Sequence, residues 1–102
     1  MDVEFVRQRI TELRLQKGVS EHRMSLDLGH ARSYVHGIVS GKTLPSMTEF
    51  LYICEYFDIT PAQFFDYNEK DVLLMAEIHR ECKKLKIEDK KRILDLVKRL
   101  QG

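Results

Sequence analysis

The 102-residue sequence has no tryptophan, only two prolines and two cysteines, and no long apolar run. Its unbroken apolar stretches, such as Val72 to Ala76, are far shorter than the ~20 residues that a transmembrane helix needs. Acidic and basic residues occur throughout the first 20 positions, unlike a secretory signal. We therefore expect neither a membrane-spanning nor a secreted protein. The length allows one domain, or a small domain with an added element, and excludes a multidomain enzyme.

The scarcity of cysteine argues against a disulfide framework. Cys54 and Cys82 lie 28 positions apart among apolar neighbours, as reduced core thiols do. His79 and Cys82 are spaced to share a helical face, but two ligands without a second pair are too few for a zinc site. We expect no metal and no cofactor.

The chain also lacks an excess of charge of either sign, since 17 Lys and Arg against 16 Asp and Glu leave a net charge of +1. Bulk charge alone therefore indicates no polyanionic partner. The distribution is uneven: residues 1–67 have seven bases and nine acids, whereas residues 68–102 have ten bases and seven acids. Residues 28–48 contain no Asp or Glu but include Arg32 and Lys42. Because phosphates sense charge within a Debye length of ~8 Å, this local window matters more than the total.

Helical periodicity organises the first part of the chain. Apolar residues recur at three- and four-residue steps over residues 3–17, which predicts a helix that ends at Gly18. Ser20 is a candidate N-cap for a second, short helix that Gly29 ends. A third helix is expected over about residues 31–40. No segment alternates apolar and polar residues between hairpin turns, so we expect an all-α fold.

Further helices are predicted after residue 45. Pro45 and Ser46 open a fourth helix with a wide apolar stripe, formed by Phe50, Leu51, Ile53, Cys54 and Phe57. Thr60 is expected to cap a fifth helix, in which Phe64 and Phe65 face inward. A longer helix should begin at residues 68–69 and another after residues 87–89. The pattern predicts five helices through about residue 67, followed by a C-terminal pair.

Two brief helices joined by a glycine turn are typical of a helix-turn-helix. The spacing from residue 5 to 65 is similar to that of the Cro/repressor-like (XRE) helix-turn-helix family at Ile10, Leu13, Arg14, Gly18, Val19, Ser20, Leu28, Gly29, Val35, Ile38, Gly41, Lys42, Pro45, Ser46, Leu51, Ile53, Phe57, Ile59, Phe64 and Phe65. The resemblance implies a five-helix repressor-like DNA-binding domain at residues 1–67 and a C-terminal helical extension at residues 68–102.

The resemblance also implies a function, that of a cytoplasmic transcriptional regulator of bacterial or phage origin. Such a protein, a repressor rather than an enzyme, reads double-stranded DNA with its third helix in the major groove. The family's base-contacting positions correspond here to Arg32, Ser33, His36 and Gly37. Positions that approach phosphate correspond to Tyr34, Lys42 and Thr43. An arginine at such a place can donate two hydrogen bonds to guanine.

The C-terminal pair has more apolar surface than one small domain can cover. One stripe comprises Leu74, Met75, Ile78, Cys82 and Leu85, and the other comprises Ile93, Leu96, Val97 and Leu100. These residues predict a homodimer interface, which would align two third helices on a palindromic operator. In the alternative, both helices fold back onto their own domain.

Several residues depart from the family pattern and leave a second hypothesis open. Glu21 replaces a glutamine, Val39 replaces a glutamate, and Gly37 offers no side chain at a reading position. A protein-interaction adaptor or antitoxin-like module with weak or no DNA binding is compatible with these changes. An enzyme is the least supported class, because no nucleophile–base pair or phosphate-binding glycine loop is visible.

Overall fold

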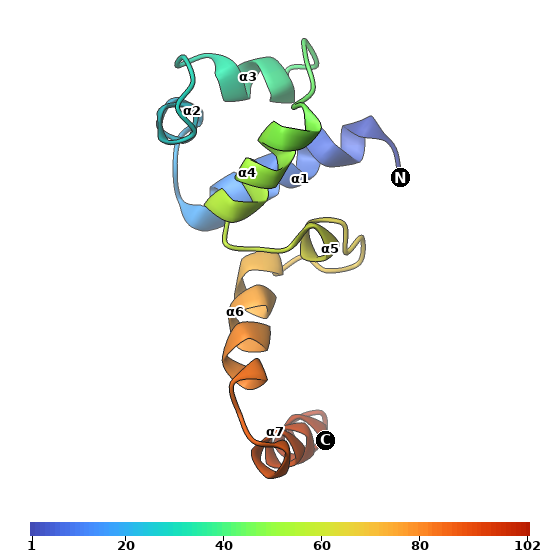
Figure 1. Cartoon of the computed structure of the whole chain (residues 1–102). Coiled ribbons are helices and arrows are strands. Elements are labelled where there is room, and N and C mark those ends of the chain that lie inside the picture. Colours follow the sequence, from blue (N-terminus) through green and yellow to red (C-terminus); the bar gives the residue numbers. More distant parts are fainter.

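The computed structural model describes residues 1–102 as seven helices and no strand (Figure 1). The all-α expectation is therefore confirmed. The helices are α1 (Val3–Lys17), α2 (Glu21–Asp27), α3 (Tyr34–Val39), α4 (Met47–Tyr56), α5 (Pro61–Phe64), α6 (Val72–Lys83) and α7 (Ile87–Leu100). None of them is both long and apolar enough to cross a membrane.

Local capping signals set most of the helix ends, as the sequence predicts. Helix α1 ends at Gly18, whose φ of 77° is left-handed and favours glycine. The Ser46 hydroxyl accepts a hydrogen bond from the Glu49 N–H at the start of α4. At α5, Thr60 and Gln63 form a capping box in which each side chain accepts from the other's backbone N–H.

The core lies between α1, α2, α3, α4, α5 and the first part of α6. Its thirteen apolar members are Ile10, Leu13, Met24, Val35, Ile38, Phe50, Ile53, Cys54, Phe57, Ile59, Phe64, Val72 and Ala76. Burial raises the pKa of the Cys54 thiol to about 11, and both cysteines are free. Two predicted core positions are wrong. Leu51 is exposed, and Phe65 is 39 % exposed beside the buried Phe64.

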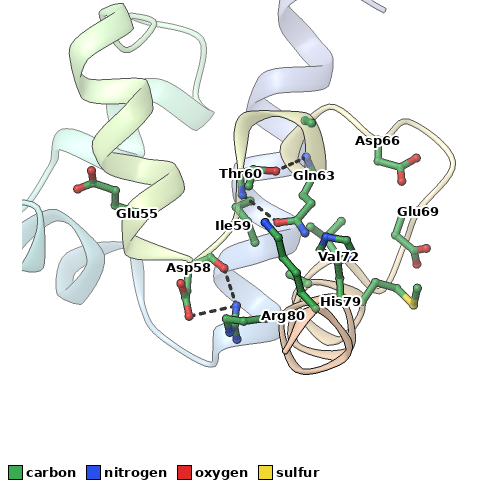
Figure 2. Close-up of a pocket in the computed structure, with 14 residues that line it drawn as sticks. Glu55, Asp58, Ile59, Thr60, Gln63, Asp66, Glu69, Val72, His79 and Arg80 are labelled. Carbon is green, nitrogen blue, oxygen red and sulfur yellow. Dashed lines mark hydrogen bonds and ion pairs between the residues drawn. The ribbon is translucent and has the colours of Figure 1, made fainter. Parts of the chain in front are cut away.

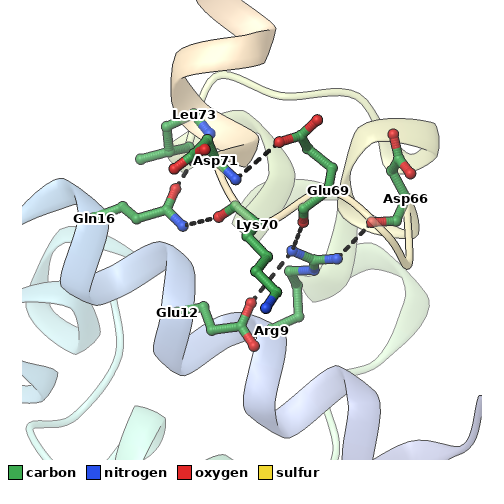
Figure 3. Close-up of polar contacts among 8 residues, drawn as sticks. All are labelled: Arg9, Glu12, Gln16, Asp66, Glu69, Lys70, Asp71 and Leu73. Carbon is green, nitrogen blue, oxygen red and sulfur yellow. Dashed lines mark hydrogen bonds and ion pairs between the residues drawn. The ribbon is translucent and has the colours of Figure 1, made fainter.

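A buried arginine joins α1 to the segment before α6 (Figure 3). Arg9 is 2 % exposed, and its guanidinium donates to the carbonyl oxygens of Asp66 at 2.6 Å and Glu69 at 2.8 Å. It also lies 3.3 Å from the Glu12 carboxylate and 4.9 Å from the centre of the Phe5 ring. These contacts hold residues 66–69 in a turn.

Helix α6 therefore begins at Val72, later than the predicted start at residues 68–69. Gln16 supports the same junction, since its side chain donates to the Lys70 carbonyl and accepts from the Leu73 N–H. Val72 and Ala76 are buried in the core. The first two turns of α6 thus complete the core that α1–α5 build.

Helix α7 stands apart from this core, at the far end of α6 (Figure 1). None of its residues is buried. The molecule measures 48 × 25 × 23 Å and has a radius of gyration of 16.2 Å, against the ~13 Å expected for a compact domain of about 100 residues. Helices α2 and α3 occupy one end of this elongated shape and α7 occupies the other.

Candidate nucleic-acid interface

Helices α2 and α3 pack against each other and form the helix-turn-helix unit. The Ser20 hydroxyl accepts from the Arg23 N–H and caps α2, as predicted. Gly29, with φ 79°, ends that helix by turning the chain toward α3. Helix α3 is shorter than the predicted span of 31–40. It begins at Tyr34, after a turn in which the Tyr34 N–H donates to the Ala31 carbonyl.

A serine from α2 caps the start of α3. Ser33, the N-cap residue of α3, makes no capping hydrogen bond with its side chain. Instead the buried Ser25 hydroxyl accepts from the Val35 N–H at 3.0 Å and donates to the Glu21 carbonyl at 2.7 Å. Because one hydroxyl satisfies backbone groups of both helices, it fixes the position of α3 relative to α2.

Replacement of Ser25 by alanine should lower the free energy of unfolding by about 0.5–2 kcal/mol, the usual cost of losing a capping side chain. Urea denaturation followed by circular dichroism measures this change. Ser40→Ala is the matched control, because the Ser40 hydroxyl makes only a long, exposed contact of 3.4 Å at the other end of α3. Equal stabilities of the two variants would contradict the capping role of Ser25.

An arginine from α1 holds the other end of α3. Arg7 Nε donates to the Ile38 carbonyl at 3.0 Å, while Arg7 Nη1 contacts Glu4 at 2.7 Å. A cation at a helix C-terminus is also favoured by the helix dipole. Sequence reasoning missed this role, because 31 positions separate Arg7 from Ile38 and no local pattern connects them.

Three predicted base-reading residues lie on the open side of the α2–α3 unit. Arg32, Ser33 and His36 are all exposed. Arg32 has no hydrogen bond or ion pair within the chain, so its guanidinium is free to bind another molecule. His36 Nδ1 lies 3.2 Å from Glu21 Oε1. The structure therefore exposes an unpaired cation just before α3 and an imidazole within it.

Lys42 and Thr43 lie beside α3 because both backbone N–H groups donate to the Gly37 carbonyl, at 3.0 and 3.2 Å. Both side chains are exposed. A Cβ on Gly37 would lie 3.7 Å from Thr43 Cγ2, an ordinary contact distance. Gly37 is half-buried, and the Thr43 methyl group lies beside it.

Tyr34 differs from the other predicted contacts. Its ring stacks on His30 with centroids 3.7 Å apart, and its hydroxyl is buried without a hydrogen-bond partner. Burial, reinforced by the nearby Glu49 carboxylate, raises the pKa of Tyr34. His30 in turn contacts Glu49 at 2.8 Å. The structure therefore places Tyr34 in the packing between the helices, with its hydroxyl away from solvent.

Two carboxylates from outside the acid-free window of residues 28–48 each lie against a histidine of the window. Glu21 contacts His36, and Glu49 contacts His30. Both carboxylate side chains are about one quarter to one third exposed. The exposed cations of the window, Arg32 and Lys42, have no acidic partner within the chain.

A second concave region lies at α5 and α6 (Figure 2). This open groove has a volume of about 670 Å³ and an apolar floor that includes Ile59, Val72 and Ala76. Its rim carries both signs of charge, and Asp58 and Arg80 pair at 3.2 Å. No three histidine, cysteine or acidic side chains are close enough to hold a metal ion. The groove shares no residue with α2 or α3.

The predicted dimer-interface residues lie on α6, on α7 and in the connection between them. On α6, Leu74 and Ile78 are exposed and Cys82 is half-buried, while the exposed Leu85 lies in the connection between α6 and α7. On α7, the exposed residues are Ile93, Leu96, Val97 and Leu100. The alternative, in which both helices fold back onto their own domain, holds for the start of α6, where Val72 and Ala76 are buried in the core, and not for α7. Both stripes remain available to a partner.

The chain matches a family described as helix-turn-helix over residues 10–64, more than half of its length. The match begins within α1 and ends with α5. No curated protein and no solved structure matches the chain significantly. The matched segment contains the whole α2–α3 unit and all of the predicted DNA-contacting residues, and it excludes α6 and α7.

Proposed function

This chain belongs to the Cro/C1-type (XRE) helix-turn-helix family of DNA-binding transcription regulators, and from that premise we propose a homodimeric repressor that reads double-stranded DNA with α3. The observation that carries the proposal is Arg32, an exposed and unpaired cation just before α3, a helix to which α1 and α2 each make a hydrogen bond. Side chains near the start of a recognition helix reach base edges in the major groove.

The proposed contacts divide into two groups. Arg32, Ser33 and His36 face the base edges, while Lys42 and Thr43 bind the phosphate backbone after α3. Tyr34 and Gly37 are left out, because the Tyr34 hydroxyl is buried and Gly37 has no side chain with which to read a base. Phosphate contacts fix the register, and base contacts supply the sequence preference. The mildly acidic composition of residues 1–67 limits non-specific affinity, so specificity depends on a few contacts.

Dimerisation is proposed through α6 and α7, at residues 68–102. Helix α7 has an apolar stripe and no buried residue, and a lone amphipathic helix gains little stability in water. A twofold dimer buries the same patch of both copies, so the stripes on α6 and α7 would each find a partner. Two copies of α3 then face two half-sites of one operator.

Replacement of Leu96 by glutamate should convert the dimer to a monomer, since it places a carboxylate in the proposed apolar interface. Sedimentation equilibrium of the full chain measures the mass per particle. The full chain is needed, because removal of residues 68–102 would take Val72 and Ala76 out of the core. Leu15→Glu, at an exposed leucine of α1, is the control. A monomeric wild type, or equal masses for both variants, would contradict the interface.

Selection from a random-sequence duplex pool, repeated over a series of salt concentrations, tests DNA reading itself. A repressor of this kind should enrich a palindrome and lose affinity as salt rises, because bound phosphates release counterions. The spacing of the half-sites reports the distance between the two α3 helices. If no sequence is enriched even at low salt, the adaptor or antitoxin-like function becomes the better hypothesis.

A further inference from the structure

The contact between Glu21 and His36 links the first residue of α2 to the middle of α3. Glu21 Oε1 lies 3.2 Å from His36 Nδ1. The Glu21 side chain is 30 % exposed, and that of His36 is 60 % exposed. The other ring nitrogen, Nε2, forms no hydrogen bond within the chain. His36 therefore has one nitrogen turned to the protein and one available to a ligand.

The two residues are held in register by the backbone as well. The Glu21 carbonyl accepts from the Ser25 hydroxyl, which accepts from the Val35 N–H. Val35 directly precedes His36, so the carboxylate and the imidazole share a common anchor. This anchor prevents α2 and α3 from sliding apart. The Glu21–His36 contact therefore lies beside this anchor, at the surface of the α2–α3 unit.

The chemistry of this contact determines which nitrogen carries the proton. A carboxylate can only accept a hydrogen bond, so His36 must donate from Nδ1. In a neutral imidazole, the other nitrogen is then an acceptor, because only one of the two is protonated. Glu21 therefore makes Nε2 of neutral His36 a hydrogen-bond acceptor. Without Glu21 as a partner, the neutral His36 ring can instead carry its proton on Nε2 and present an N–H at that nitrogen.

The major groove distinguishes bases by such donors and acceptors. Cytosine N4 and adenine N6 carry amino groups that donate, whereas guanine offers only acceptors and thymine offers an acceptor and a methyl group. We propose that Glu21 determines the base preference of His36 by fixing its tautomer, so that neutral His36 selects the amino group of cytosine or adenine. Glu21 is a positioning residue here. The proposal rests on the proposed function, with α3 in the major groove.

Nitrogen-15 NMR of the free full chain at pH 8, where a histidine is ordinarily neutral, tests the tautomer without DNA. The expected result is a protonated Nδ1 and a bare Nε2 for His36 in the wild type. In Glu21→Ala, the ring should lose this preference. A wild-type His36 that is protonated at Nε2, or spectra that are unchanged by Glu21→Ala, would overturn the proposal even if DNA binding is confirmed.

Duplex selection at the same pH tests the consequence. The wild type should enrich cytosine or adenine at one position of each half-site, and His36→Ala should remove that preference. Glu21→Ala should reduce the preference for cytosine or adenine by roughly fivefold, so that guanine or thymine is also accepted at this position. Glu49→Ala, which breaks the other histidine–carboxylate contact, should leave the position unchanged.

The outcomes separate the two proposals. An enriched operator in which this position shows guanine, or does not respond to Glu21→Ala, overturns the role of Glu21 and leaves DNA reading intact. If no sequence is enriched by any variant, the proposed function fails and the role of Glu21 fails with it, whatever tautomer the NMR spectra show.

Discussion

Replacement of Arg9 by alanine should lower the free energy of unfolding by about 3–5 kcal/mol, since two hydrogen bonds to a charged donor, worth about 1.5–3 kcal/mol each, are lost. The Arg9 guanidinium is the donor for the carbonyl oxygens of Asp66 and Glu69. Without it, two backbone acceptors lose their charged donor and a cavity opens between α1 and the segment before α6. Chemical denaturation of the full chain measures the loss.

Two controls distinguish this role from a general effect of charge. Arg9→Lys keeps the charge but not the forked geometry that reaches two carbonyls, so it should recover only part of the stability. Arg23→Ala removes an exposed arginine that pairs with Asp27 on the surface of α2, and surface pairs contribute little. If Arg9→Ala is no less stable than Arg23→Ala, the buried hydrogen bonds do not hold the start of α6.

The parts of the fold that were predicted from the sequence are those that local signals control. Gly18, Ser20, Ser46 and Thr60 lie next to the helix ends that they set, so reading the neighbouring residues was sufficient. The starts of α3 and α6 were misplaced because distant side chains control them. Ser25 supplies a hydrogen bond to α3 from another helix, and Arg9 holds the turn before α6 across more than fifty positions.

In the candidate site, too, the sequence predicted what depends on local spacing and missed what depends on contacts between segments. The family spacing predicted contacts at Arg32, Ser33 and His36, and all three are exposed: Arg32 and Ser33 in the turn before α3, and His36 on the outer face of the helix. Spacing could not show that Tyr34 stacks on His30, nor that Glu21 contacts His36, since these contacts depend on how neighbouring segments pack. Glu21 stood out in the sequence as an unexpected charge, and its partner became visible only in the structure. Contact with DNA itself stays a prediction.

Replacement of Arg32 by alanine should relax one base position of the selected operator while leaving the fold unchanged. Arg32 is exposed and unpaired, so its loss removes no intramolecular contact. A bidentate arginine–guanine pair gives ~1–3 kcal/mol of discrimination, which corresponds to roughly a 5- to 150-fold preference for guanine. Duplex selection, followed by affinity measurements on operators that differ at this position, gives the size of the effect.

Two further variants separate base reading from simple attraction. Arg32→Lys keeps the positive charge but cannot donate two parallel hydrogen bonds, so it should retain affinity for non-specific DNA and lose most of the guanine preference. Lys42→Ala removes a proposed phosphate contact and should weaken all sequences about equally, with a salt slope lower by about one. If Arg32→Ala behaves as Lys42→Ala does, Arg32 binds the backbone, and the preference must come from Ser33 and His36.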